Sequence, residues 1–179
     1  MMMKHALKMT VLAAAAVVST GSMVAQGGDT TVQDKMFVAK STQGSLGEIA
    51  AARLALKKSK NDDVRTFAQK MIDDHTQLIA DLKPYADRMG VKPPMKPNKT
   101  AQMEVQRMMS MSGDKFDREY VTAMVADHHK DVGEFKNEAD TTSNSDLKGT
   151  VSSGLQVVQM HTTMIDGIAQ KMNLPTPAM

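Results

Sequence analysis

Three histidines and one glutamate have the residue types and the spacing of a metal-binding site. His75, His128 and His161 each fall near the middle of a separate predicted long helix. Glu48 falls near the middle of the one remaining long helix. Imidazole and carboxylate groups together bind first-row transition ions well, so Zn, Fe or Cu would suit this set. In an antiparallel four-helix bundle the four helix midpoints share one layer, where these side chains could meet around a single ion.

Three further side chains could take part in such a site. Asp131 lies one turn after His128, where it could join the ligands or orient them. Met124 lies one turn before His128, and Met164 follows the histidine of the last helix by three residues. A thioether beside an imidazole suits copper, particularly Cu(I). The alternative is a metal-free centre, in which methionines fill irregular core space and the glutamate accepts hydrogen bonds from the imidazoles.

The elements that must position these residues are amphipathic helices. Apolar residues repeat in alternating steps of four and three, which is the spacing of one buried helix face. The clearest case is the last long helix, whose predicted buried face consists of Leu147, Val151, Gly154, Val158, His161, Ile165, Ile168 and Met172. His75 and His128 occupy equivalent positions in their helices. His129 is turned about 100° away from that face and is expected to meet solvent.

Capping and helix-breaking residues set the expected helix boundaries. Asn61 can cap a helix start, and Gly90 is suited to a left-handed stop. The predicted long helices cover residues 32–59, 62–89, 115–140 and 146–172, and a short helix covers 100–111. Each of the four candidate ligands lies 14–16 residues after the residue that begins or caps its helix. At about 1.5 Å per residue, the four therefore differ in height by no more than a turn or two.

The N-terminus has the pattern of a secretory signal peptide. Lys4 and Lys8 supply positive charge, residues 11–18 form an apolar core, and a stretch rich in small residues follows, with cleavage expected after Ala25. The apolar core is shorter than the roughly 20 residues of a transmembrane helix, and retention as an uncleaved anchor is the alternative. The expected organisation is a signal peptide over 1–25, a flexible segment over 26–31, a four-helix bundle over 32–174 and a C-terminal tail over 175–179.

The composition of the mature chain excludes several classes of partner. Removing the signal leaves 20 basic and 20 acidic side chains, and this balance argues against a nucleic-acid-binding surface. No later stretch is apolar enough to cross a membrane, and the sequence contains no cysteine, so helix packing must supply the stability. We expect an exported protein of the periplasm, with outer-membrane association or release outside the cell as alternatives. The sequence identifies no protein partner and leaves homo-oligomer formation open.

Three blocks of the sequence resemble a known family. They are EIAAARLALKKSKNDDVRTFAQKMIDDH at 48–75, SGDKFDREYVTAMVADHHKDVGEF at 112–135 and GLQVVQMHTTMI at 154–165. In this order and spacing they are similar to the ferritin-like family called domain of unknown function 4142, whose members are often labelled exported or outer-membrane proteins. The similarity covers about residues 34–172. It implies an all-α, ferritin-like antiparallel four-helix bundle, with a short extra helix between the second and third long helices.

The resemblance also bears on the site. It implies that Glu48 and the three histidines match recurring polar positions of the family, and it supplies no activity. Ferritin-like di-iron proteins add a Glu-x-x-His pair on each of two helices. Here Ile72 and Val158 stand three residues before His75 and His161, so we expect one ion or none rather than a two-iron centre.

The function that these patterns favour is binding rather than catalysis. We expect an exported bundle that holds one transition-metal ion and serves metal handling or a stress response. One alternative is a metal-dependent redox enzyme, which would need an open coordination position and a route for substrate. A second alternative is a metal-free interaction module of the cell envelope, in which the buried polar layer fixes the register of the helices.

Overall fold

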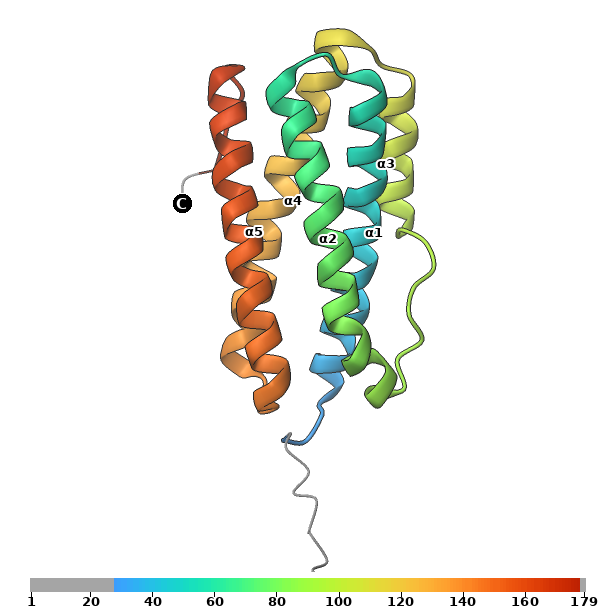
Figure 1. Cartoon of the computed structure of the whole chain (residues 1–179), viewed down its shortest axis with the longest axis vertical. Coiled ribbons are helices and arrows are strands. Elements are labelled where there is room, and N and C mark those ends of the chain that lie inside the picture. Colours follow the sequence, from blue (N-terminus) through green and yellow to red (C-terminus); the bar gives the residue numbers. More distant parts are fainter. Residues whose placement is uncertain (1–27, 178–179) are drawn as a thin grey trace, which may run out of the picture.

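The computed structural model describes residues 28–177, which form a bundle of α-helices without strands (Figure 1). The helices are α1 (Val32–Lys58), α2 (Asp62–Met89), α3 (Lys99–Met109), α4 (Gly113–Thr141) and α5 (Ser145–Lys171). The all-α class and the short extra helix between the second and third long helices are therefore confirmed. Among the described helices, none is both long and apolar enough to cross a membrane. The predicted signal peptide lies outside the described residues.

Side-chain caps fix where these helices begin and end. The Asn61 side chain accepts hydrogen bonds from the first-turn backbone of α2, and Gly90 ends that helix in the left-handed conformation, at φ 67°. Asn98 and Asn144 cap α3 and α5 in the same way. Thr31 and Asp34 form a capping box at the start of α1. These contacts satisfy backbone N–H groups that have no partner inside a helix, so local sequence sets where α1, α2, α3 and α5 begin, whereas α4 begins after Ser112 without a side-chain cap.

The helices pack as two antiparallel hairpins, α1 with α2 and α4 with α5 (Figure 1). Between the hairpins, α2 packs on α5 and α1 packs on α4. The connection after α2 runs back along the bundle, so α4 runs in the same direction as α2. The short α3 follows this connection and lies against α1 and α4. This crossover brings the four long helices together with their midpoints at one level.

A polar layer divides the apolar core into two clusters. One cluster contains Phe67, Met71, Phe116, Tyr120 and Ile165 among its buried members. The other contains Phe37, Leu82, Phe135, Leu147 and Val151. On each long helix, the residue predicted as a metal ligand lies between the segments that build the two clusters. The polar side chains therefore meet where the apolar packing is interrupted.

Gly154 is the point of closest approach between α5 and its neighbours. A Cβ atom there would lie 2.6 Å from the Phe135 ring and 3.1 Å from Leu78. We expect Gly154→Ala to lower the free energy of unfolding by about 1–3 kcal/mol, because both neighbours are buried and must move. Urea denaturation measures this loss. Gly149→Ala on the same helix is the control, since no atom lies within 4 Å of its added Cβ and it should stabilise by about 0.5–1 kcal/mol.

Two buried carboxyl groups join the start of α1 to the end of α4. Asp34 and Glu138 are each 1% exposed, and the Gln33 amide donates a hydrogen bond to Glu138 at 3.1 Å. Burial raises the pKa of Glu138 to about 7, and the neighbouring Asp34 adds to the shift. Hydrogen bonds from Thr31 and Glu138 outweigh burial and lower the pKa of Asp34. Glu138 therefore keeps its proton to a higher pH than Asp34 does.

The raised pKa of Glu138 makes stability depend on pH. Because Glu138 keeps its proton up to about pH 7 when folded but loses it near pH 4.5 when unfolded, its contribution is complete below pH 4.5 and is lost as the pH rises through 7. We expect Glu138→Gln to flatten the fall in the free energy of unfolding across this window, as measured by urea denaturation at several pH values. Glu134→Gln removes the same charge from α4 and should leave the slope unchanged; equal slopes for the two variants would contradict the assignment.

Candidate metal centre

The three histidines predicted to share a layer do meet in the bundle core. One ring nitrogen from each of His75, His128 and His161 lies within 4.8 Å of the corresponding nitrogens of the other two. The ring centroids are 5.3–5.9 Å apart, and the side chains are 0–2% exposed. They come from α2, α4 and α5, so the site exists only in the folded bundle. The depth argument from helix offsets is therefore confirmed for these three residues.

Two of the three rings are oriented by hydrogen bonds to groups that accept but cannot donate. The Nδ1 atom of His128 donates to the backbone carbonyl of Met124 at 2.9 Å. The Nε2 atom of His161 donates to the carboxylate of Asp74 at 2.7 Å, and Lys70 pairs with the same carboxylate. Because a carbonyl oxygen and a carboxylate accept but do not donate, the proton sits on the outer nitrogen of each ring. The other nitrogen of each ring then carries a lone pair.

His75 is held from α1. Its Nδ1 atom lies 3.0 Å from the hydroxyl of Ser45 and 3.2 Å from a carboxylate oxygen of Glu48. The other Glu48 oxygen lies 3.7 Å from Nδ1 of His128. The structure thus brings Glu48 to the histidines, as predicted, but against their Nδ1 atoms. The set of side chains placed to share one ion contains the three histidines and not Glu48.

Each histidine also has one buried ring nitrogen without a hydrogen-bond partner among the described residues. These atoms are Nε2 of His75, Nε2 of His128 and Nδ1 of His161. In every case this is the nitrogen opposite the one that contacts an acceptor or hydroxyl group. Buried polar atoms are nearly always paired in folded proteins, and one ligand placed between the rings could pair with all three nitrogens.

Burial keeps the three rings neutral. It lowers the pKa of His128 to about 3, and it lowers the pKa of His75 well below its ordinary value with help from the other two rings. Burial also lowers the pKa of His161, although Asp74 opposes the shift. Neutral imidazole is the form that coordinates a metal. Near neutral pH the centre therefore offers three lone pairs and no charge of its own.

Aromatic side chains close one side of the centre. Phe67 is fully buried, and its ring centroid lies 5.9 Å from that of His128 and 6.0 Å from that of His161. Tyr120 packs on Phe67 at 6.4 Å. Apolar walls exclude water and strengthen any electrostatic interaction inside the site. The helical pattern placed Phe67 on the buried face, but no sequence signal linked it to the histidines.

The remaining predicted residues lie around the centre without joining the histidine cluster. Asp131 and Met124 line a cavity beside Glu48, and burial raises the pKa of Asp131 to about 7. Met164 is half-buried and packs against the apolar core. None of the three belongs to the histidine cluster. They remain candidates for a supporting role rather than members of the observed group.

The expectation that His129 meets solvent is wrong. Its Nε2 atom lies 3.0–3.1 Å from both carboxylate oxygens of Asp166, and both side chains are largely buried, at 17% and 13% exposed. His129 does point away from the three clustered rings, as the helical period requires. Helix α5 covers the side of α4 on which His129 lies, and the sequence of α4 alone does not show this.

Ser45, which contacts His75, was not predicted as a site residue, because a lone serine in a predicted helix carries no signal.

Residues 19–168 match the model of a family described as Domain of unknown function (DUF4142). The chain belongs to the DUF4142 family. The matched region contains every residue named above as a candidate ligand, and it confirms the family predicted from the three sequence blocks. Among curated proteins, no sequence matches this DUF4142 chain.

Solved structures similar to this DUF4142 protein share its fold at low sequence identity. A DUF305 fragment from Deinococcus radiodurans has a TM-score of 0.70 and 16% identity, over 80% of this chain and 99% of that chain. A DUF305 protein from Streptomyces coelicolor, proposed to be secreted, has a TM-score of 0.67 and 9% identity, over 82% and 97%. A two-domain protein from Anabaena variabilis, with DJ-1/ThiJ/PfpI-like and ferritin-like domains, has a TM-score of 0.60 and 14% identity, over 85% of this chain and 42% of that chain. The predicted ferritin-like bundle is therefore confirmed.

Proposed function

We propose that this protein binds one transition-metal ion through His75, His128 and His161. Two observations carry the proposal: each of the three rings has a buried nitrogen with no hydrogen-bond partner among the described residues, and one ring nitrogen of each lies within 4.8 Å of one ring nitrogen of the other two. A buried polar atom left unpaired costs about 1–3 kcal/mol, and a single ion would satisfy all three at once. Metal-bound histidines in general donate their other ring nitrogen to a carboxylate or carbonyl, which is the arrangement observed here for two rings.

The geometry requires only a small adjustment to hold an ion. Ligand distances of about 2.0–2.1 Å at tetrahedral angles correspond to roughly 3.3 Å between nitrogens. The three nitrogens, separated by up to 4.8 Å, would reach this spacing by tilting the rings inward. A second cavity, of about 350 Å³, reaches His75 and Ser45 from the surface between α1 and α4 and supplies a route for the ion.

The ligand set favours zinc or copper and also accepts iron. A site of three neutral imidazoles without a thiolate follows the general affinity order of divalent ions for nitrogen ligands, in which copper and zinc bind more tightly than iron. Three protein ligands leave at least one coordination position for water or another side chain. In this proposal Glu48 and Asp74 act on the outer nitrogens of the rings, and Asp131 and Met124 flank the approach to the centre.

The proposed role is metal handling or a stress response in the cell envelope. The predicted signal peptide supports export, and one structural relative from Streptomyces coelicolor has itself been proposed to be secreted. Periplasmic location follows as a proposal from the same features. A protein without cysteine would hold its metal through histidine alone, and these ligands cannot be lost to disulfide formation.

Metal content and thermal stability test the proposal together. Protein purified without an affinity tag should carry close to one ion of zinc, copper or iron per chain, as measured by elemental analysis. After removal of metal, the preferred ion should raise the melting temperature, because ligand at 100 times its Kd stabilises by about 2.7 kcal/mol.

The double variant with His75→Ala and His161→Ala should lose both the bound metal and the metal-dependent rise in melting temperature. His129→Ala is the control and should keep them, because His129 pairs with Asp166 outside the cluster. Stability that no ion changes would leave the metal-free module as the better interpretation.

A further inference from the structure

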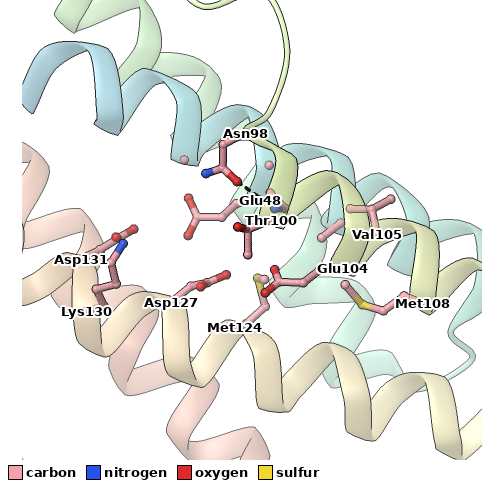
Figure 2. Close-up of a pocket in the computed structure, with 14 residues that line it drawn as sticks. Glu48, Asn98, Thr100, Glu104, Val105, Met108, Met124, Asp127, Lys130 and Asp131 are labelled. Carbon is pink, nitrogen blue, oxygen red and sulfur yellow. Dashed lines mark hydrogen bonds between the residues drawn. The ribbon is translucent and has the colours of Figure 1, made fainter. Parts of the chain in front are cut away.

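A cavity of about 300 Å³ between α1, α3 and α4 is lined by four carboxylates (Figure 2). We call it the acidic cavity, defined by Glu48 on α1, Glu104 on α3, and Asp127 and Asp131 on α4. The hydroxyl of Thr100 lines the same space. The four acids come from three helices, of which α1 is far from α3 and α4 in the sequence. The acidic cavity is therefore a product of the fold and not of a local cluster of acidic residues.

One basic side chain lines the acidic cavity within residues 28–177. It is Lys130, which pairs with Glu134 at 3.2 Å and whose charge also acts on Asp127 and on Asp131, beside which it lies in Figure 2. Arg107, on the same helix as Glu104, pairs with Glu119 instead. One lysine against four carboxyl groups leaves the acidic cavity with an excess of acidic side chains.

Glu48 points to a ligand independently of the other acids. Its side chain is 4% exposed, and neither of its oxygens has a hydrogen-bond partner among the described residues. Figure 2 shows its carboxylate projecting from α1 into the acidic cavity. The nearest nitrogen, Nδ1 of His75 at 3.2 Å, is hydrogen-bonded to Ser45. A buried carboxylate needs a cation or several hydrogen-bond donors to remain in a folded protein.

The backbone keeps the four acids together despite their repulsion. Asp127 and Asp131 are spaced i and i+4 on one helix, and like charges at this spacing cost roughly 0.2–0.5 kcal/mol. Gly47 allows α3 to lie close against α1 beside the acidic cavity. A Cβ atom at Gly47 would lie 2.8 Å from Cβ of Ala101 and would push α3 away from α1. This close approach brings Glu104 over the carboxylates of α1 and α4.

We propose that the acidic cavity binds a hard divalent cation of the size of calcium, separate from the histidine centre. Calcium takes 6–8 oxygen ligands in flexible geometry. No three of the four carboxylates have oxygens within 4.8 Å of one another, so these side chains would turn toward the ion and water would fill the remaining positions. Magnesium needs near-ideal octahedral ligands at about 2.0–2.1 Å, and this cavity is too wide to supply them from its walls. The cation would neutralise Glu48 and tie α3 to the bundle.

Calcium titration of the metal-stripped protein tests this site. We expect one calcium ion per chain by isothermal titration calorimetry and a rise in melting temperature with calcium. The double variant with Asp127→Asn and Asp131→Asn should lose at least tenfold in affinity. In calcium-free buffer it should melt at or above the wild-type temperature, because a like-charge pair has been removed; this result would show that the loss of binding is not a loss of folding.

Two controls separate this site from general charge and from the histidine centre. Asp73→Asn with Asp81→Asn removes the same charge from the exposed face of α2 and should leave calcium binding unchanged. His75→Ala with His161→Ala should also retain calcium binding, so that failure of the transition-metal site and failure of the calcium site can be told apart. An absence of calcium-dependent heat and melting shift at about 1 mM calcium would overturn the proposal. Equal loss of affinity in the two double aspartate variants would do the same.

Discussion

Replacing Phe67 with alanine is expected to lower the free energy of unfolding by about 3–5 kcal/mol, the largest loss of any single change considered for this protein. The ring is fully buried between α2, α4 and α5 and lies against His128, His161 and Tyr120. Its removal leaves a cavity beside the three unpaired nitrogens, and water entering there would compete with the metal. We therefore expect weaker metal binding as well as lower stability, measured by urea denaturation and by chelator competition.

Phe37→Ala separates these two effects. Phe37 is 7% exposed and packs edge-on against Phe135 at 5.0 Å, in the apolar cluster on the other side of the polar layer. The same side chain is lost, so stability should fall by a comparable amount, but the wall of the histidine centre remains. If metal affinity falls equally in both variants, the ring of Phe67 has no special role at the centre and global stability explains the change.

Replacing Asp74 with asparagine is expected to weaken metal binding by about 10- to 100-fold, the size of effect seen when partners of metal ligands are changed. The Asp74 carboxylate accepts the Nε2 proton of His161 at 2.7 Å. Although burial acts against it, hydrogen bonds from Lys70 and His161 lower the pKa of Asp74, so it is ionised when it receives this proton. An amide carries no charge and can turn its NH2 group toward the ring, so it would no longer fix the Nδ1 lone pair toward the centre.

Asp73→Asn provides a charge-matched comparison on the adjacent residue. Asp73 accepts a hydrogen bond from Gln69 on the exposed face of α2 and has no contact with the histidines. Competition with a metal chelator should give wild-type affinity for this variant. Equal affinities for the Asp73 and Asp74 variants would show that ring orientation does not control binding, even if the histidines themselves are ligands.

The two proposed sites meet at Glu48. Its oxygens lie 3.2 Å from Nδ1 of His75 and 3.7 Å from Nδ1 of His128, and its carboxylate also lines the acidic cavity. Burial, with Asp131 and Asp127 nearby, raises the pKa of Glu48 well above its ordinary value. A cation in the acidic cavity would favour the ionised form of Glu48. Glu48 is therefore the side chain that both proposed sites have in common.

The helices themselves followed from local sequence. Asn61 and Gly90 mark the ends of α2 because capping and left-handed geometry depend on neighbouring residues alone. The shared depth of His75, His128 and His161 also followed, because a constant rise per residue converts an offset in sequence into a height along a helix. Family membership could be predicted for the same reason: the residues that match lie in these regular segments.

Only the tertiary structure decided how the side chains are directed toward one another. The choice of ring nitrogen that faces inward depends on acceptors from other helices, such as Asp74 for His161. The partner of His129 depends on which helix covers it, and the approach of Glu104 to Glu48 depends on how α3 settles on Gly47. Periodicity fixes the face and the height of a residue on its own helix. The rotation of neighbouring helices and the rotamers at their contacts come from packing of the whole bundle, which no single segment encodes.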